Sequence, residues 1–410
     1  MKQQRDRVAG LDVHRDVVVA AVRIGHGDDV TYHKAKFATT TAGSGELAAW
    51  MSDFEVTRVV MEATGVYWKP VYYPLEGLFD ELWLVNAAHV KNVPGRKTDL
   101  NDAEWLADVA AHGMVRPSFV PPPEIRELRE LTRYRKTQIA IRGQEIQRLD
   151  KVLQDAGIKI SSVASKVLSK SSRAMIEALI VGENDAAVLA GMALGRMRSK
   201  IPELTDALVG RFAAHHGVVA RAILDHIDFL DATISRLDEE ITSRLGPFRD
   251  AVTLLCTIPG ISTRIAEVIV AETGADMSRF PTPEQFAAWA GLAPANHESA
   301  GRRRPAGTRK GGEWLKRSLI EGARTAARDK DSYLGVQYRR IAVRRGANKA
   351  AVATAHSILV AIWHMLTQGV PYQDLGADYF ARRDIHKETR RLVTRLQALG
   401  YDVTLTQAAA

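Results

Sequence analysis

The N-terminal part of the chain alternates between short strand-forming runs and amphipathic helical patterns. Runs rich in valine and other strand formers lie at 8–13, 16–24, 30–37, 58–61 and 82–86. Helical periodicity lies at 47–54, 67–79 and 99–112. The first three runs follow one another across polar turns, and the later runs alternate with helices. The pattern therefore predicts a mixed sheet covered by helices.

The order of these elements points to one architecture. Three hairpin-linked strands followed by alternating helices and strands form the layout of the ribonuclease-H-like fold. The proline-rich run Val120–Pro123 then interrupts the pattern, because consecutive prolines end regular structure. We expect the α/β domain to end there.

Two later segments carry the apolar seam of long amphipathic helices. The first seam is Leu128, Leu131, Ile139, Ile146, Leu149 and Leu153. The second is Ile227, Leu230, Ile234, Leu237, Ile241 and Leu245. We expect one long helix from each segment. The seams fit an internal helical hairpin as well as a coiled coil with another chain, and the intervening residues 158–220 contain alanine-rich helical segments without an assigned function.

A third unit is expected to begin near Pro247, with a short helix, a tight turn and a second helix. The apolar run 254–258 leads into Pro259-Gly260, and a helical pattern resumes through Glu272. In a helix-hairpin-helix such a turn holds a DNA phosphate irrespective of base sequence. The same pattern also forms a packed corner between helices. Gly260 is therefore a candidate phosphate contact, and we expect the rest of this unit to be helical.

Positive charge is concentrated in one region. The chain carries a formal charge of +8, from 56 Lys and Arg against 48 Asp and Glu. Residues 302–349 hold fifteen basic and four acidic residues, a local charge of 15 − 4 = +11, which leaves 8 − 11 = −3 for the rest. A concentrated basic stretch favours a polyanionic partner, usually nucleic acid. On charge alone, a solvated helical face fits equally well.

Length and composition exclude several classes of protein. The 410 residues exceed one ordinary domain, and 46% hydrophobic with 25% charged residues exclude wholesale disorder. The single cysteine, Cys256, cannot close an intramolecular disulfide or supply a zinc-finger ligand set, which favours a reducing compartment. No cleavable apolar segment opens the chain, and nowhere do eighteen apolar residues follow one another. We expect a cytoplasmic protein with no membrane partner.

Four acids lie where this fold would gather them. Asp12 ends the first strand and Glu62 ends the fourth, so both carboxylates emerge at one edge if those strands are neighbours. Asp99 and Asp102 are three residues apart at the start of a predicted helix and face the same side. Phosphodiester chemistry uses Mg²⁺ held by carboxylates, because hard oxygen ligands leave coordination sites for water and phosphate oxygens. The four acids are thus a candidate Mg²⁺ site.

Each acid also has a purely structural explanation. Asp99 and Asp102 at a helix start would interact favourably with the helix dipole, and Glu62 would cap the helix that follows it. Asp16, four residues after Asp12, is a rival ligand. The ribonuclease-H-like order favours the metal site, since fold and acids then agree.

Ordered motifs in two parts of the chain carry a family resemblance. The N-terminal motifs are Gly10–His14 (GLDVH), Met61–Trp68 (MEATGVYW) and Lys97–Ala103 (KTDLNDA). The C-terminal motifs are Ile258–Ile261 (IPGI), Ala290–Pro294 (AGLAP) and His297–Gly301 (HESAG). Together they resemble the DEDD transposases of bacterial insertion sequences, the family numbered one hundred and ten, over residues near 8–113 and 252–325.

This resemblance implies a domain organisation. It implies a RuvC-like domain, a coiled-coil middle and a C-terminal transposase domain containing the helix-hairpin-helix. On the segmentation above we expect these at 1–122, 123–247 and 248–372, with a tail at 373–410.

The resemblance also implies an activity. The chain would be a recombinase that excises and inserts its element, with Mg²⁺ at Asp12, Glu62, Asp99 and Asp102 and a serine nucleophile in the C-terminal domain. Related members are guided by a bridge RNA whose two loops pair with target and donor DNA. By motif position the serine is Ser299.

The serine motif departs from the family pattern. Many relatives have Ser-Ser-Gly-Gly where this chain has Glu298–Gly301, so a single serine is available and its neighbour is an acid. A serine hydroxyl is a weak nucleophile and needs a base or a metal-polarised phosphate. Without the resemblance, Ser299 would be read as a loop residue that caps its own backbone. The candidate phosphate contacts, which otherwise serve surface solubility, are Arg302, Arg303, Arg304, Arg309, Lys310, Lys316 and Arg317.

These observations favour an RNA-guided, site-specific DNA recombinase in which the acids and Ser299 build one site. Strand exchange needs at least two cuts held together, so a dimer or tetramer follows from the reaction. The first alternative is a metal-dependent junction nuclease that hydrolyses DNA with water and forms no covalent intermediate. The second is a non-catalytic nucleic-acid scaffold, which leaves the four acids and the Ser299 loop unexplained.

Overall fold

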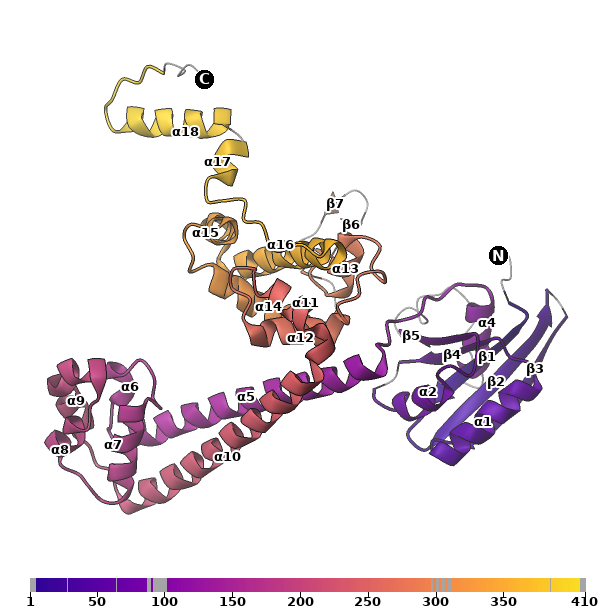
Figure 1. Ribbon diagram of the computed structural model, residues 1–410, viewed down its shortest axis with the longest axis horizontal. Helices are drawn as coiled ribbons and strands as arrows, with labels where there is room; N and C mark the ends of the chain where they lie inside the picture. The colour runs from indigo at the N-terminus through magenta and orange to yellow at the C-terminus, as the bar shows by residue number, and fades with distance from the viewer. Residues whose placement is uncertain are drawn as a thin grey trace. The chain divides into compact units, whose positions relative to one another are not determined.

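The chain divides into two compact units, Met1–Val120 and Pro121–Ala410. The division lies within the proline-rich run where the sequence places a boundary. The computed structural model describes residues 5–27, 29–63, 65–86, 90, 102–295, 298–299, 302–303, 307–308, 311–383 and 385–405 (Figure 1).

A five-stranded mixed sheet forms the centre of the first unit. Its strands are β1 (Arg7–Val13), β2 (Val17–His26), β3 (Asp29–Ala38), β4 (Arg58–Glu62) and β5 (Glu81–Val85). Their order is β3-β2-β1-β4-β5. The first three strands pair antiparallel, whereas β4 runs parallel to both β1 and β5. The mixed sheet and the pairing of the first strand with the fourth are therefore confirmed.

Helices cover both faces of this sheet. Helices α1 (Thr41–Asp53) and α2 (Lys69–Leu75) pack on one face, and α4 (Asp102–Ala111) packs on the other (Figure 1). Along β1, Ala9 and Leu11 join the core under α1 and α2, whereas Val8 joins the core under α4. Because side chains alternate along a strand, Gly10 and Asp12 face α4 as Val8 does.

In the second unit, the long helices α5 (Pro123–Asp155) and α10 (Ala214–Arg244) lie side by side (Figure 1). Ion pairs join them at Arg135–Asp238, 2.8 Å, and Arg142–Asp231, 2.5 Å. The number rises by 142 − 135 = 7 on α5 while it falls by 238 − 231 = 7 on α10. The helices thus form an antiparallel hairpin within one chain, which is one of the two arrangements that the sequence allows.

The middle of the hairpin seam differs from the expected apolar pattern. Ile139, placed in the seam from its spacing, is 36% exposed, while the neighbouring Gln138 is buried. Thr132 and Arg135 are buried as well, because the facing helix offers carboxylates at this level. The apolar spacing alone therefore predicted the wrong residues of α5 to face α10 at this level.

The segment between the two long helices forms a small helical cap with its own core. Its elements are α6 (Ile160–Val163), α7 (Lys170–Ile180), α8 (Ala186–Gly191), the 3₁₀ helix η1 (Gly195–Lys200) and α9 (Ile201–Leu208). Leu149 and Leu153 of α5 and Leu224 of α10 belong to the same core. The cap thus packs on the tip of the hairpin.

The remaining helices pack around the base of the hairpin. They are α11 (Arg249–Leu255), α12 (Thr263–Thr273), α13 (Pro283–Trp289), α14 (Glu313–Ala326), α15 (Tyr333–Arg345) and α16 (Ala347–Gln368), preceded by the 3₁₀ helix η2 (Gly246–Phe248) and followed by α17 (Tyr379–Arg383) and α18 (Ile385–Ala398). Leu128 of α5 and Ile241 of α10 join their core. Helix α16 is long and apolar enough to span a membrane, but Ile358 and Ile362 are fully buried in that core.

Candidate active site

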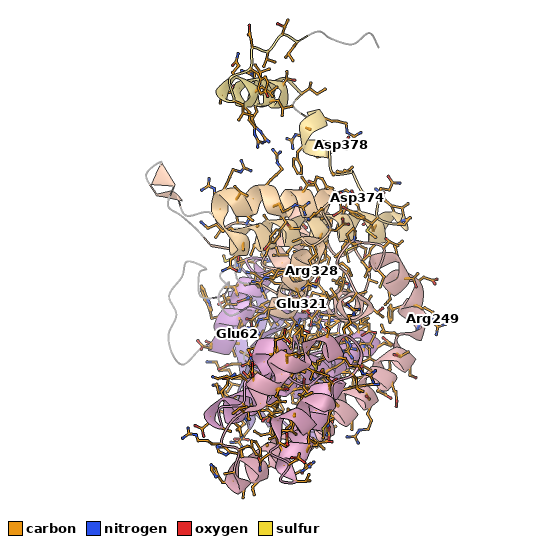
Figure 2. The ribbon with its side chains drawn as sticks, turned by 90° about the vertical axis from the view of Figure 1, so that its left-hand side faces the viewer. Glu62, Arg249, Glu321, Arg328, Asp374 and Asp378 are labelled. Atoms are coloured by element: carbon orange, nitrogen blue, oxygen red, sulfur yellow. The ribbon has the colours of Figure 1, made fainter. Side chains whose placement is uncertain are left out.

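Asp12 and Glu62 end neighbouring strands on one face of the sheet. Leu11 pairs with Met61 across the parallel strands β1 and β4, so the next residues along both strands are Asp12 and Glu62. Glu62, labelled in Figure 2, also pairs with Val85 of β5. Residues paired in a parallel sheet point to the same face, which here is the face covered by α4. The expected convergence of these two acids is therefore a property of the register.

Asp102 approaches the same edge because α4 packs directly on β1. A Cβ built on Gly10 would lie 2.0 Å from the Ala103 carbonyl oxygen and 2.7 Å from the Ala107 nitrogen, so only glycine permits this packing. At the other end of α4, the Ala110 carbonyl accepts a hydrogen bond from Arg58, the first residue of β4. Helix α4 therefore runs opposite to β1, and its first residue, Asp102, lies at the end of the helix nearest the edge where β1 ends.

Buried arginines fix α4 on the sheet. Arg23 of β2 is 2% exposed, and its Nε donates to Asp108 Oδ1 of α4 at 2.9 Å. The Tyr32 hydroxyl donates to the same carboxylate oxygen at 2.6 Å. Burial, together with this bond to Asp108, raises the pKa of Tyr32, so the hydroxyl stays protonated and donates. Sequence reasoning missed these residues, because an arginine inside a strand pattern gives no sign of whether it is buried.

The alternatives for the acids are partly resolved by their surroundings. Asp16 lies in the turn after β1, is 85% exposed and pairs with Arg15, so its side chain faces solvent. Glu62 does not cap α2, whose N-cap is Trp68. Asp102 does lie in the first turn of α4, where the helix dipole favours it. Of the two rival aspartates, Asp12 is the less exposed, with 30% of its side chain accessible. His14 Nε2 lies 3.1 Å from Asp12 Oδ2.

The donor set suits Mg²⁺ in chemistry but is incomplete in the described residues. Carboxylate oxygens are the ligands that Mg²⁺ prefers. Asp99 lies outside the described residues. Within the ranges that the structure describes, no three His, Cys, Asp or Glu side chains form a group that could hold a metal ion. Asp12, Glu62 and Asp102 are all described residues, so the three of them do not form such a group by themselves.

Ser299 lies at the end of a β-hairpin rather than in an irregular loop. Strands β6 (Glu298–Ser299) and β7 (Arg302–Arg303) pair antiparallel, with Ser299 opposite Arg302. Below them Pro294 pairs with Thr308, and the Ala295 N–H donates to the Gly307 carbonyl. Ser299 is therefore the last residue of β6 and pairs with the first residue of β7.

Two of the seven candidate phosphate contacts have described side chains. Lys316 Nζ donates to Thr308 Oγ1 at 2.5 Å, which ties α14 to the stem of the Ser299 hairpin. Arg317 is exposed and pairs with Glu313 at 2.5 Å. Arg302 and Arg303 form β7 through their backbones. Arg304, Arg309 and Lys310 lie outside the described residues.

The turn at Gly260 packs against a helix. Gly260 has φ +88°, and a Cβ there would lie 2.3 Å from the Gly322 carbonyl oxygen and 2.6 Å from the Ala326 nitrogen, both of α14. Its lack of a side chain is therefore explained by packing between α11, α12 and α14. A phosphate contact at Gly260 stays a prediction.

Two transposase family models match this chain. A DEDD transposase family model (IS110) matches residues 9–158, and the model of the transposase IS116/IS110/IS902 family matches residues 252–339. A probable family 20 transposase of Pseudomonas aeruginosa is 27% identical over 323 residues, which are 77% of this chain and 85% of that protein. The transposase for insertion sequence element IS1111A of Coxiella burnetii is 24% identical over 377 residues, 90% of this chain and 91% of that protein.

The two matched regions contain the candidate residues of each unit. The N-terminal match contains the strand-end acids and α4, and the C-terminal match contains the turn at Gly260 and the Ser299 hairpin. A putative transposase of Sinorhizobium fredii, 26% identical over 284 residues, covers 68% of this chain. The chain belongs to the IS110 family of DEDD transposases and is a DNA transposase.

Proposed function

We propose that this transposase is a site-specific recombinase that cuts and rejoins DNA through Ser299, with Mg²⁺ held by Asp12, Glu62, Asp99 and Asp102. The observation that supports it best is that Asp12 and Glu62 end paired strands on the face of the sheet covered by α4, the helix that begins at Asp102. The strand order β3-β2-β1-β4-β5 suits a ribonuclease-H-like, RuvC-like domain.

In this proposal the four acids bind Mg²⁺, and neighbouring residues fix the positions of the acids. Mg²⁺, when bound, would polarise a phosphate oxygen and stabilise the charge that develops on it. His14 contacts Asp12 and limits the directions in which that carboxylate can turn. The contacts of Arg23 and Tyr32 with Asp108 keep α4, and with it Asp102, in place.

Ser299 supplies the nucleophile. Its hydroxyl oxygen forms a bond to phosphorus while the bond from phosphorus to one deoxyribose oxygen breaks. The proton lost by the serine ends on the released hydroxyl group. The resulting phosphoserine keeps a phosphoester bond, so the reverse attack by a different DNA hydroxyl rejoins strands without a further energy source. Arg302, paired with Ser299 in the hairpin register, is suited to carry positive charge near the phosphate.

Guidance by a bridge RNA is part of this proposal and rests on the family resemblance and on the basic region at 302–349. A dimer or tetramer also follows from the reaction, since two cuts must be held together. The seams of α5 and α10 face each other within one chain, so subunits would meet elsewhere. We place the reaction in the cytoplasm, on DNA.

The test is a denaturation-resistant protein–DNA adduct. The protein is purified with the RNA it retains and incubated with donor and target DNA and Mg²⁺, beside Ser299→Ala and the control Ser262→Ala. Ser262 is exposed and precedes α12 without a side-chain cap bond. We expect an adduct with wild type and Ser262→Ala and none with Ser299→Ala.

Two other results would redirect the assignment. Free cleaved ends without an adduct, equal in wild type and Ser299→Ala, would support a RuvC-like nuclease that uses water. An adduct that persists in Ser299→Ala would remove this residue from the mechanism.

A further inference from the structure

The helical cap at the tip of the α5–α10 hairpin carries charge of one sign over much of its length. Two stretches of its sequence, 156–176 and 186–202, contain four and three Lys or Arg residues and no Asp or Glu. These cations are Lys159, Lys166, Lys170, Arg173, Arg196, Arg198 and Lys200. Because the residues outside 302–349 sum to −3, the cap is a second, separate positive region of the chain.

The fold of the cap brings the two basic stretches together. The Leu194 N–H, just before η1, donates to Ser171 Oγ of α7 at 2.9 Å. At the other end of η1, Lys200 Nζ donates to the Val163 carbonyl of α6 at 3.0 Å. Helix η1 therefore lies against the segment 163–171, and the basic residues of both stretches share one part of the cap.

Four cations of this part of the cap are exposed. Met197 of η1 packs against the core of the cap, so Arg196 and Arg198 on either side of it remain at the surface. Lys166 and Lys170 belong to the segment that faces η1 and are exposed as well. We call these four residues the cap cations.

No carboxylate of the described residues neutralises the cap cations, whose side chains form no ion pair or hydrogen bond there. Other arginines of the hairpin and the cap do pair with acids, as Arg135 does with Asp238 and Arg173 with Asp228. Exposed like charges repel one another, and a polyanion that binds them relieves this repulsion and loses its own condensed counterions to solvent. The surface of the cap therefore suits a polyanion.

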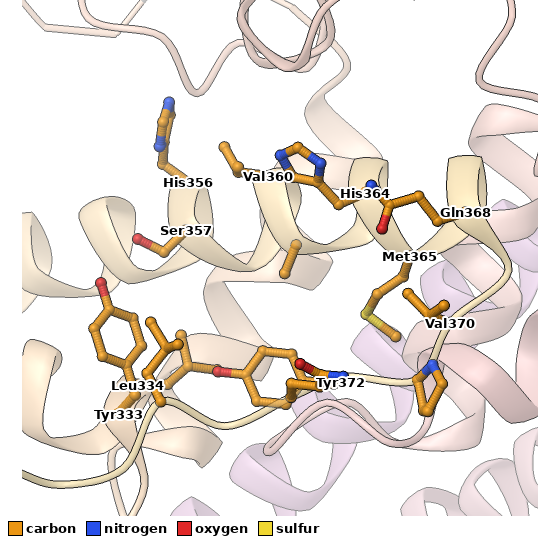
Figure 3. A pocket seen from close by; sticks show the side chains of 14 residues that line it. Tyr333, Leu334, His356, Ser357, Val360, His364, Met365, Gln368, Val370 and Tyr372 are labelled. Atoms are coloured by element: carbon orange, nitrogen blue, oxygen red, sulfur yellow. The ribbon is translucent and has the colours of Figure 1, made fainter. Parts of the chain in front are cut away.

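The cavity formed by α16 and the segment around Tyr372 suits a polyanion poorly by comparison (Figure 3). Its volume is about 570 Å³, and its lining includes Val360, His364 and Gln368 (Figure 3). None of the described residues that line it is Lys or Arg. The cations available to a polyanion thus lie on the surface of the second unit rather than in this cavity.

We propose that the cap cations bind the phosphate backbone of duplex DNA, irrespective of its base sequence. DNA is the polyanion on which a DNA transposase acts, and Lys and Arg contacts to phosphates supply the part of DNA binding that does not depend on sequence. The contact requires no cleavage, so it does not rest on the proposed role of Ser299.

The long hairpin sets the distance between this contact and the rest of the second unit. Leu128 of α5 belongs to the core at the base of the hairpin, and Leu149 of the same helix belongs to the core of the cap. They are 149 − 128 = 21 residues apart, which is about 32 Å along an α-helix. Since duplex DNA rises about 3.4 Å per base pair, this distance equals roughly nine base pairs. The cap thus extends the DNA that one chain can hold by nearly a helical turn.

The test is the salt dependence of DNA binding by two independent double variants of the full chain. Fluorescence anisotropy follows a labelled duplex of mixed sequence, about 40 base pairs long, with protein from which RNA has been removed by washing in high salt. Arg196→Gln with Arg198→Gln, and separately Lys166→Gln with Lys170→Gln, should each lower the affinity at least about tenfold at about 50 mM salt. The slope of log affinity against log salt should become shallower by up to about 2 × 0.9 = 1.8 in each double variant.

Two further double variants serve as controls. Arg236→Gln with Arg249→Gln removes the same charge from exposed positions of α10 and α11 outside the cap, and should leave the affinity within about twofold of wild type. Arg196→Lys with Arg198→Lys keeps the charge of the cap and should bind as wild type does. Circular dichroism checks that each protein is folded, and the two Gln variants of the cap test the same claim at separate positions.

Three results would overturn the inference. The first is wild-type affinity for DNA in both Gln variants of the cap. The second is an equal loss of affinity in the control Arg236→Gln with Arg249→Gln, which would show that net charge matters and the cap does not. The third is unchanged DNA affinity with less RNA retained by the unwashed protein, which would assign the cap cations to RNA. Because binding is measured without cleavage, none of these results bears on the serine adduct, and a missing adduct leaves the cap contact intact.

Discussion

Gly10 of β1 lies directly against the backbone of Ala103 in α4, so closely that a Cβ on Gly10 would stand 2.0 Å from the Ala103 carbonyl oxygen. Asp12 is two residues beyond Gly10 on the same face of β1, and Asp102 is one residue before Ala103. A single close contact between strand and helix thus sets the spacing of two of the acids.

Gly10→Ala should disable DNA cleavage without unfolding the sheet. The added methyl group must push α4 away from β1, because its nearest neighbours are backbone atoms that cannot rotate aside. A displacement of about 1 Å at a catalytic group costs roughly 100-fold in rate. The measurement is the initial rate of adduct formation. Gly45→Ala is the control, since a Cβ there meets nothing within 4 Å; equal losses in both variants would contradict this role for Gly10.

Asp108→Asn should loosen α4 by weakening its hold on a buried cation. Arg23 is almost fully buried, and its guanidinium would lose its carboxylate partner. We expect the free energy of unfolding to fall by about 2 to 4 kcal/mol, as for other buried pairs that lose one charge. Hydrogen exchange of β1 and α4 amides measures it. Asp378→Asn, in the exposed pair with Arg382 and labelled in Figure 2, should leave those amides unchanged.

Stability of the first unit should fall at acidic pH through Glu81. The Arg58 guanidinium, 2.6 Å away, holds the pKa of the Glu81 carboxyl below its usual value of 4.5. A carboxyl with a lowered folded pKa stabilises the fold fully above the usual value and loses that effect as the pH falls through the folded pKa.

The substitution Glu81→Gln tests directly whether the charge of Glu81 makes stability fall at acidic pH. At pH 7 the variant should be less stable than wild type by about 1 to 2 kcal/mol, measured by hydrogen exchange in β4 and β5. The difference should shrink as the pH falls below about 4.5. A difference that stays constant from neutral to acidic pH would show that the charge of Glu81 is irrelevant.

The hairpin should depend on Arg135 far more than on Arg142. Arg135 is buried and bonds both Asp238, at 2.8 Å, and the nearly buried Glu267 of α12, at 2.6 Å. Arg135→Ala leaves Glu267 without its partner, so we expect a loss of about 3 to 5 kcal/mol in unfolding free energy.

Arg142→Ala is the matched control, seven residues further along α5. Its partner Asp231 is half exposed, so its removal should cost about 1 kcal/mol or less. Chemical denaturation followed by circular dichroism compares the two variants. Similar losses for both would mean that burial of the Arg135 cluster adds nothing.

Much of the first unit could be predicted from the sequence because its signals are local. Strand-forming runs and tight turns gave the five strands, and Asp12 and Glu62 stand out because both end such runs. What could not be predicted are contacts between distant segments. Arg23 forms a hydrogen bond with Asp108, 85 positions away in the sequence. The need for glycine at position 10 becomes clear only from the packing of α4 against it.

The second unit shows the limits of periodicity. The two long helices were predicted, but the position of Ile139 was not, because a seam that contains ion pairs places polar residues where spacing favours apolar ones. The hairpin that carries Ser299 consists of two-residue strands, too short for an alternation pattern.

The most direct test of the account is whether the acids are needed for the serine adduct. Asp12→Asn and Glu62→Gln keep the shape of each side chain and remove its charge, so the sheet edge should stay intact while Mg²⁺ binding is lost. We predict that adduct formation falls at least about 100-fold in each variant, with DNA binding retained. Adduct formation at the wild-type rate in both variants would contradict the central claim that these acids and Ser299 act in one reaction.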